Sequence, residues 1–479
     1  MLPPMRTVPV VLLAISLVAC LPDNPSLDGE TGDEDSGDET GEPEARVETG
    51  LLGCPVGEAC TIVAVSQTID DRVDLFTASG PGPAYRGAVD VDLVPNPNGD
   101  ISGDYLDEPY GLGWDGTALY VLVGHYPTRA LGSLLRIPAA SLADYADGAH
   151  VATSEWFAGG TSTSQGVSLT PLARTEPLSL TVQPSTGAVW IATFANDLTL
   201  PDVAWTEPSE LLRIADPRAL GPETEPEASE LGCAGAWAMV AVDDDAETLA
   251  VACDGDERVV LIDTDSAAPR CAADIPFADK RVRYLAPDGL GGVVVGEAPP
   301  IVSASEDARI WWFDGDCQQR GFSVLDGVTS WELRDMVLVP GAAGPRWLLA
   351  RADGDARGVV ILSGDPEAGT VEPCGRIDAL DDAGAWTAVG GTAPLRPHGL
   401  ALGSDGLGLA VGAGPASYDN AGPGYGSVWW VELEPGEDAC TREVAEVTEL
   451  GAAAPAVDPN LPATWRRAPD VLTLIEVSP

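Results

Sequence analysis

Several residue types are scarce in this chain, and their scarcity narrows what the protein can do. Of 479 residues only 25 are lysine or arginine, against 75 aspartates and glutamates, and the net charge is −50. So acidic a chain repels phosphate backbones, which excludes nucleic-acid binding. Three histidines and the lack of any C-x-x-C pair leave a zinc or haem site without its usual ligands. We therefore expect no cofactor.

The N-terminal apolar run is too short to cross a bilayer as a helix. It extends from Val8 to Val18, follows Arg6, and ends in Leu17-Val18-Ala19-Cys20. A small residue directly before a cysteine at the end of such a run resembles the lipobox of bacterial lipoproteins. That resemblance implies cleavage before Cys20 by signal peptidase II and acylation of Cys20, and several acyl chains make a durable anchor. The alternative is an ordinary secretory signal with a chance cysteine.

The segment from Leu21 to Gly50 is typical of a tether. It contains eleven acidic residues, one arginine and no aromatic residue, so it cannot bury enough apolar surface to fold. We interpret it as a disordered spacer rather than an acidic binding tail. Leu21 after the cysteine favours the outer over the inner membrane of a bacterial envelope, by analogy with enteric sorting rules. The predicted organisation is a signal peptide (1–19), a lipidated cysteine with an acidic linker (20–50) and a folded domain (51–479).

The other eight cysteines indicate disulfide bonds, because an even number in an exported chain is typical of an oxidised domain. Two pairings are local enough to predict. Cys54 and Cys60 flank the short loop PVGEA, and Cys233 and Cys253 lie at the two ends of a predicted hairpin. Hairpin ends lie within the limit of about 7 Å that a disulfide sets between Cα atoms. The pairing of the remaining four stays open.

From Cys60 onward the chain follows one repeated pattern. Short apolar strands alternate with glycine, proline and acidic turns, and helical periodicity is nearly absent. The unit is a strand, a tight turn, a second apolar strand, a loop and a third strand, and a fourth strand often follows. It recurs about every 50–70 residues. A four-stranded sheet repeated radially is a β-propeller, and the domain is too long for one β-sandwich.

Two of these repeats, HGLALGSDGLGLAVG and MVAVDDDAETLAVACDGDERVVLIDTD, resemble those of the bacterial NHL/YVTN-type propellers, a group that includes lactonase-like members. We predict an all-β fold, a β-propeller of seven blades, with six as the alternative count. The strand VLTLIEV (471–477) is expected to complete the first blade and so to join the two ends of the ring.

Charged and aromatic residues gather where the innermost strands are expected to begin. In a propeller these beginnings ring one mouth of the central axis, so residues remote in sequence should meet there. A mouth with several bases would attract a small anion or a partner's carboxylate. Alternatively, the charges neutralise each other and only hold the ring together. The predicted ligand-binding residues are Glu108, Tyr110, Glu176, Trp237, Arg283, Arg334, Asp335 and Arg396.

Two functions fit these observations. The first is a platform that binds a protein or a small anionic ligand. The second is a lactonase- or esterase-like hydrolase with His398 as the candidate general base, although no G-x-S-x-G nucleophile motif occurs. Calcium could bind the alternating oxygen ligands of residues 96–104, but turn formation accounts for the same residues. We expect a monomer whose membrane partner is reached through Cys20.

The anchor leads to a direct test. Replacement Cys20→Ala removes the thiol that would receive the diacylglyceryl group, so the protein should leave the membrane fraction and appear as soluble protein. Fractionation of cells that express the wild type or the variant measures this. Retention of the variant in membranes would contradict lipidation at Cys20.

Overall fold

The computed structural model describes a domain that begins at Gly50. The chain divides into two units, Met1–Arg46 and Val47–Pro479, and all described residues belong to the second unit. Cys20, Glu176 and residues 96–104 lie outside the described residues. The described residues are 50–67, 71–80, 82–91, 108–124, 131–143, 149–152, 156, 166–175, 177–194, 208–221, 223–275, 281–298, 307–329, 333–341, 344–352, 357–387, 395–414, 426–435, 440, 443–450 and 469–478.

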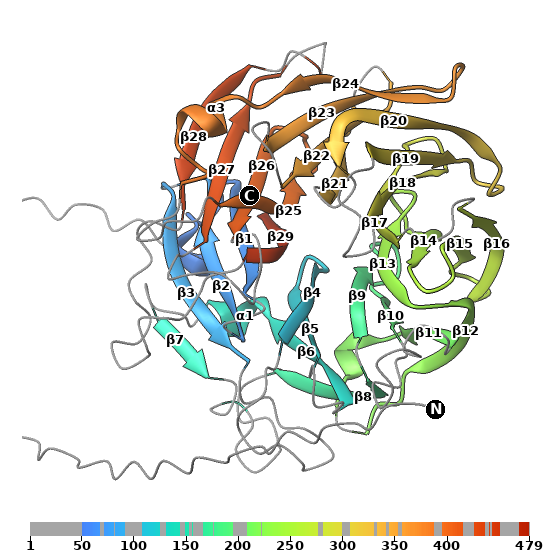
Figure 1. Cartoon of the computed structure of the whole chain (residues 1–479). Coiled ribbons are helices and arrows are strands. Elements are labelled where there is room, and N and C mark those ends of the chain that lie inside the picture. The colour runs from blue at the N-terminus through green and yellow to red at the C-terminus, as the bar shows by residue number, and fades with distance from the viewer. Residues whose placement is uncertain are drawn as a thin grey trace, which may run out of the picture. The chain divides into compact units, whose positions relative to one another are not determined.

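The domain is a ring of seven antiparallel blades around one axis (Figure 1). Blades 2 to 7 are each built from strands that follow one another in the sequence, except that blade 2 omits β7, and the strands are named here from the axis outward. Blade 2 contains β4 (Glu108–Trp114), β5 (Ala118–Gly124), β6 (Leu131–Pro138) and β8 (Ser168–Thr175). Blade 3 contains β9 (Pro177–Val182), β10 (Val189–Thr193), β11 (Pro208–Ile214) and β12 (Glu227–Ala234). Blade 4 contains β13 (Ala236–Ala241), β14 (Thr248–Cys253), β15 (Arg258–Asp263) and β16 (Ala268–Asp274).

The next three blades repeat this arrangement. Blade 5 contains β17 (Arg281–Pro287), β18 (Val293–Ala298), β19 (Asp307–Phe313) and β20 (Gln319–Thr329). Blade 6 contains β21 (Leu333–Leu338), β22 (Arg346–Arg351), β23 (Gly358–Asp365) and β24 (Thr370–Arg376). Blade 7 contains β25 (Arg396–Leu402), β26 (Gly408–Gly414), β27 (Ser427–Leu433) and β28 (Val444–Glu449). Short helices also occur: η1 (Leu51–Gly53), α1 (Ala139–Leu142), η3 (Pro217–Ala219) and α3 (Ala379–Asp382).

Blade 1 combines the two ends of the domain. Its inner strand is β29 (Pro469–Val477), followed outward by β1 (Cys60–Gln67), β2 (Arg72–Thr77) and β3 (Ala84–Asp90). Strand β29 pairs antiparallel with β1, from Val477 opposite Cys60 to Pro469 opposite Gln67. The predicted closure by VLTLIEV and the count of seven blades are therefore confirmed. A fifth strand, β7 (Ala149–Ala152), extends the blade by pairing parallel to β3.

The blades are held together by apolar side chains from both faces of each sheet. The second strand of each blade is covered by the neighbouring blades on both faces, and β5 and β10 are buried along their whole length. This explains why they read as continuous apolar runs instead of alternating patterns. Trp312 of blade 5 and Trp347 of blade 6 meet edge to face with ring centroids 5.9 Å apart, and the Trp347 indole donates to the carbonyl of Pro287.

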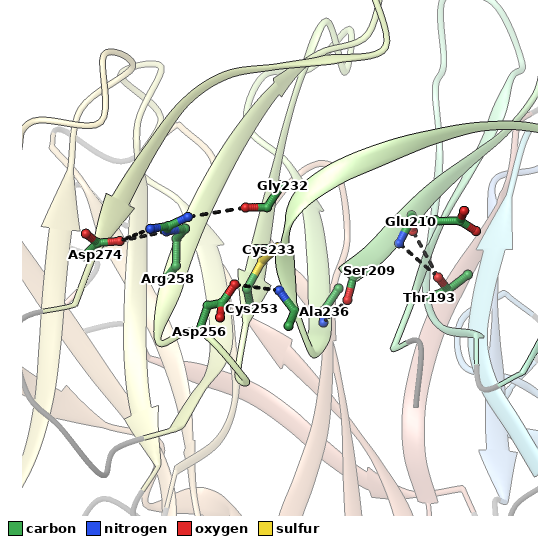
Figure 2. The surroundings of a disulfide bond; sticks show 11 residues. Thr193, Ser209, Glu210, Gly232, Cys233, Ala236, Cys253, Asp256, Arg258 and Asp274 are labelled. Carbon is green, nitrogen blue, oxygen red and sulfur yellow. Dashed lines mark hydrogen bonds and ion pairs between the residues drawn. A yellow bond between two sulfur atoms is a disulfide. The ribbon is translucent and has the colours of Figure 1, made fainter. Parts of the chain in front are cut away.

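Four disulfide bonds are present, and both predicted pairings are among them. Cys54 bonds to Cys60, and Cys233 at the end of β12 bonds to Cys253 at the end of β14. The second bond therefore joins blades 3 and 4, and the Ala236 amide beside it donates to the Ser209 hydroxyl across the same boundary (Figure 2). The pairings left open by the sequence are Cys271–Cys317 and Cys374–Cys440.

The last two disulfides occupy equivalent places in the ring. Each joins the outer strand of one blade to the connection between the third and fourth strands of the next blade, first from blade 4 to blade 5 and then from blade 6 to blade 7. At the boundary between blades 5 and 6, the equivalent places are occupied by Gly321 and Gly369. Their backbones are in direct contact, since a Cβ on Gly321 would overlap the carbonyl oxygen of Gly369. Within the described residues, no helix is long and apolar enough to cross a membrane.

Candidate functional site

All seven inner strands have a register shift near their first residues. In each blade the pairing between the inner strand and the second strand gains one residue on the inner strand. Such a β-bulge bends the strand and redirects a side chain. Because each inner strand contacts the next around the axis, the seven shifts form a circle. On each inner strand the shift begins at one residue, and we call these seven residues the axial ring: Tyr110, Leu178, Trp237, Arg283, Arg334, His398 and Asp470.

The structure brings most of the predicted site residues to this place. Tyr110, Trp237, Arg283, Arg334 and His398 belong to the axial ring itself. Glu108 and Arg396 lie two residues before a ring residue, at the first position of β4 and of β25, and Asp335 directly follows Arg334. Glu176 lies outside the described residues. The geometry shows where these residues lie, and their binding of a ligand stays a prediction.

Arg283 connects blades 4 and 5. Its guanidinium lies over the Trp237 ring, 3.8 Å from the ring centroid, and its Nε is 3.0 Å from the Asp254 carboxylate. The Asp254 side chain has no exposed surface, and Phe194 meets Trp237 edge to face with centroids 5.8 Å apart. A buried carboxylate needs such a charge partner. Arg283 is therefore neutralised within the protein, as the alternative interpretation of the charged mouth expects.

Asp335 serves a similar joining role between blades 6 and 7. Its carboxylate accepts hydrogen bonds from the backbone amides of Met336, at 2.8 Å, and Leu400, at 2.7 Å. Ser179 occupies the equivalent position in blade 3, and its hydroxyl accepts from the Met239 amide of blade 4 at 2.9 Å. Both side chains follow a ring residue and reach the inner strand of the next blade. The carboxylate of Asp335 is thus engaged in holding adjacent blades together.

Burial has a clear electrostatic effect on Asp335. It raises the pKa of the carboxyl from 3.8 to about 6, the two backbone hydrogen bonds oppose the rise, and the negative charge of Asp470 adds to it. The folded protein therefore binds this proton more tightly than the unfolded chain does. The contribution of Asp335 to the free energy of unfolding falls as the pH rises from about 4 to about 6.

His398 is almost fully buried, with 4% of its surface exposed. Its Nδ1 lies 3.9 Å from a carboxylate oxygen of Asp470, the ring residue of blade 1. The imidazole also packs against the end of β26, because a Cβ on Gly414 would lie 3.2 Å from the His398 Cδ2. A histidine beside a carboxylate can act as a base or as a polar contact between blades.

Arg334 differs from Arg283 in its surroundings. Its Nε is buried and has no hydrogen-bond partner in the part of the chain that the structure describes. Tyr284 of blade 5 lies within electrostatic reach of Arg334, Arg283 and Asp470. Burial raises the pKa of the Tyr284 hydroxyl, although the two arginines oppose the rise, so this phenol remains a neutral hydrogen-bond donor.

Sequence reasoning missed Leu178, Asp254, Tyr284 and Asp470. One signal was available for two of them, since a proline directly precedes the ring residue in four blades: Pro109, Pro177, Pro397 and Pro469. Proline has no N–H and is tolerated at sheet edges and bulges, which is the situation of the inner strand at this point. Asp254 and Tyr284 carry no such signal, because their positions depend on how two blades meet.

No protein-family model and no curated protein matches the sequence of this chain. Solved structures resemble its fold. They include Kuenenia stuttgartiensis hydrazine synthase (14% identity, TM-score 0.43, covering 70% of this chain and 78% of that one). The WD40 domain of Toxoplasma gondii coronin has 13% identity and a TM-score of 0.42, covering 71% of this chain and 70% of that one. The Myceliophteria thermophila Cps50 (Swd1) β-propeller domain has 9% identity and a TM-score of 0.43, covering 71% of this chain and 86% of that one. Such distant likenesses carry no information on function.

The chain is thus a seven-bladed β-propeller with a ring of bulged side chains at one end of its axis. Among the described residues, no group of three or more histidine, cysteine, aspartate or glutamate side chains is arranged to hold a metal ion. What the arrangement offers chemically is hydrogen-bond donors, one histidine–carboxylate pair and aromatic faces.

The role of Asp335 can be tested with a matched control. Asp335→Ala leaves two backbone amides without acceptors, and should lower the free energy of unfolding by about 2–4 kcal/mol at pH 5. The loss should be smaller at pH 8, because the wild type has by then lost the stabilisation that comes from the raised pKa. Urea unfolding at both pH values measures it.

Ser179→Ala is the control for this experiment. It orphans one equivalent amide without removing a titratable group, so it should cost about 1–2 kcal/mol at either pH. A cost of Asp335→Ala that stays constant or grows with pH would contradict the assignment.

Proposed function

We propose that this protein is a ligand-binding β-propeller of the bacterial cell envelope that takes a small anionic ligand at its axial ring. The observation that carries the proposal is the repetition of the register shift in all seven inner strands. Bulges that redirect side chains are common beside functional sites.

The anion is supported by the state of Arg334. Arg283 has a buried carboxylate partner in Asp254, whereas no described residue supplies an acceptor for the Nε of Arg334. A guanidinium whose Nε has no acceptor among the described residues suits a carboxylate, which accepts two parallel hydrogen bonds from such a group.

The location of the protein is part of the proposal. The sequence before Cys20 and the acidic segment up to Gly50 support a lipid anchor with a spacer, in the outer rather than the inner membrane. The four disulfides suit an oxidising compartment outside the cytoplasm. On this proposal, a monomeric propeller is displayed on a tether. The resemblance to NHL/YVTN-type repeats adds lactonase-like propellers as candidates for kinship.

Anion binding should be visible as stabilisation. Carboxylates and inorganic phosphate, exchanged for chloride at constant ionic strength, are expected to raise the midpoint of thermal unfolding, by the equivalent of about 1.4 kcal/mol at tenfold excess over Kd. Arg334→Gln should abolish the increase. Arg270→Gln is the matched control, because Arg270 lies on the outer strand of blade 4 in an exposed ion pair with Asp316.

If no anion raises the midpoint in the wild type, the proposed function is wrong. Equal loss of the effect in both variants would show that the anions act on the general charge of the protein and not at the axial ring.

Hydrolysis of an ester or lactone is the second candidate, and one observation favours it. His398 is buried beside Asp470, and a carboxylate next to a histidine is the usual support for a general base. The residues that the structure describes supply no nucleophile motif, so a water molecule would have to be the nucleophile.

His398→Ala tests this second candidate. With a panel of lactones and aryl esters, a hydrolase that depends on His398 should lose about 100-fold or more in kcat/KM. Asp470→Asn, which keeps the shape of the partner, should lose less. Turnover that is absent in the wild type, or unchanged in His398→Ala, would remove this candidate.

A further inference from the structure

The axial ring is divided into an apolar arc and a polar arc. In ring order, the side chains of blades 2, 3 and 4 are Tyr110, Leu178 and Trp237. Those of the following blades 5, 6, 7 and 1 are Arg283, Arg334, His398 and Asp470. From this division we infer that the ligand is amphipathic, a small monocarboxylate with a flat apolar body. The inference rests on the proposed function and adds the class of the ligand.

The aromatic side chains of the apolar arc are held in fixed orientations. Trp237 has the Arg283 guanidinium over its face and Phe194 at its edge. Tyr110 lies close over the end of β5, because a Cβ on Gly124 would come within 2.6 Å of its ring. All three residues of the arc keep part of their surface exposed. Rigid, partly exposed aromatic surfaces bind apolar groups at a low cost in conformational entropy.

The polar arc has room for one negative charge. Two of its members are already matched, Arg283 by Asp254 and His398 by Asp470, which lies 3.9 Å away. Arg334 is the ring cation for which no carboxylate of the described residues is in contact. A second negative charge on the ligand would add to the negative charge of Asp470 in the same arc, and like charges repel. A monoanion therefore fits this arc better than a phosphate dianion or a polyanion.

One junction of the two arcs lies between Trp237 and Arg283. The charge of Arg283 is satisfied by Asp254 on one side, while its flat guanidinium extends the aromatic surface of Trp237 on the other. Arg334 follows in the next blade. A ligand whose carboxylate reaches Arg334 would thus direct an attached ring toward Arg283 and Trp237, the two preceding members of the axial ring. Aromatic monocarboxylates have this arrangement of charge and body.

Three probes separate the contributions of the two arcs. Benzoate carries both the charge and the ring, acetate carries the charge alone, and benzyl alcohol carries the ring alone. Dissociation constants for the purified full-length protein can be measured by ligand-observed NMR at constant ionic strength. Benzoate should bind at least about tenfold more tightly than either of the others, the difference that burial of about half a phenyl ring gives.

Variants assign the effect to the arcs. Arg334→Gln should weaken benzoate to the level of benzyl alcohol, and Tyr110→Ala should bring it close to acetate, while Arg270→Gln should leave all three affinities unchanged. The comparison of probes on the wild type needs no variant, so it decides the matter even if a substitution prevents folding.

The outcomes distinguish this inference from the proposed function. If acetate and benzoate bind equally well and Arg334→Gln weakens both, the axial ring binds anions but the ligand class inferred here is wrong. If benzyl alcohol binds as tightly as benzoate, the carboxylate is irrelevant and the inference is again wrong. If none of the probes binds, both the inferred ligand class and the proposed function are wrong.

Discussion

The pairing of β29 with β1 is the constraint on which the rest of this structure depends. Each blade has two apolar faces, and a row of seven blades would leave one face uncovered at each end. By supplying the inner strand of blade 1 from the far end of the domain, the chain covers both faces at once. The same closure places Asp470 beside His398, so blades 7 and 1 share the axial ring in the way that every other pair of neighbours does.

Much of the fold could be read from the sequence, because a propeller repeats one simple unit. The apolar second strands, the acidic turns and the strand VLTLIEV were sufficient for the blade count and for the closure. The two disulfides within or next to a hairpin were also predictable, since local chain geometry brings Cys233 to Cys253. Cys271–Cys317 and Cys374–Cys440 were not, because their partners stand 46 and 66 positions apart and meet only through the packing of two blades.

The candidate site was only partly predictable for the same reason. The beginnings of the inner strands identified Tyr110 and Arg334, but not what each side chain contacts. Asp335 looked like a ligand for a bound molecule, yet its carboxylate accepts two backbone amides and joins blades 6 and 7. Asp470 escaped notice because it begins the one inner strand that stands apart from its own blade in the sequence. Hydrogen bonds and ion pairs between blades thus determine which polar side chains remain available, and that information lies in the packing.

The order of the strands has a consequence for biogenesis. The partners Cys60 and Val477 stand more than 400 residues apart, and the Ser66 hydroxyl that accepts from the Val471 amide is 405 positions away from it. Bringing such distant segments together carries a large loop-closure entropy, and contacts of this range form slowly. The sheet that contains β1 lacks its innermost member until β29 has emerged. The first blade to be synthesised is accordingly the last to become complete, and the edge of β1 must stay protected from other chains during that interval.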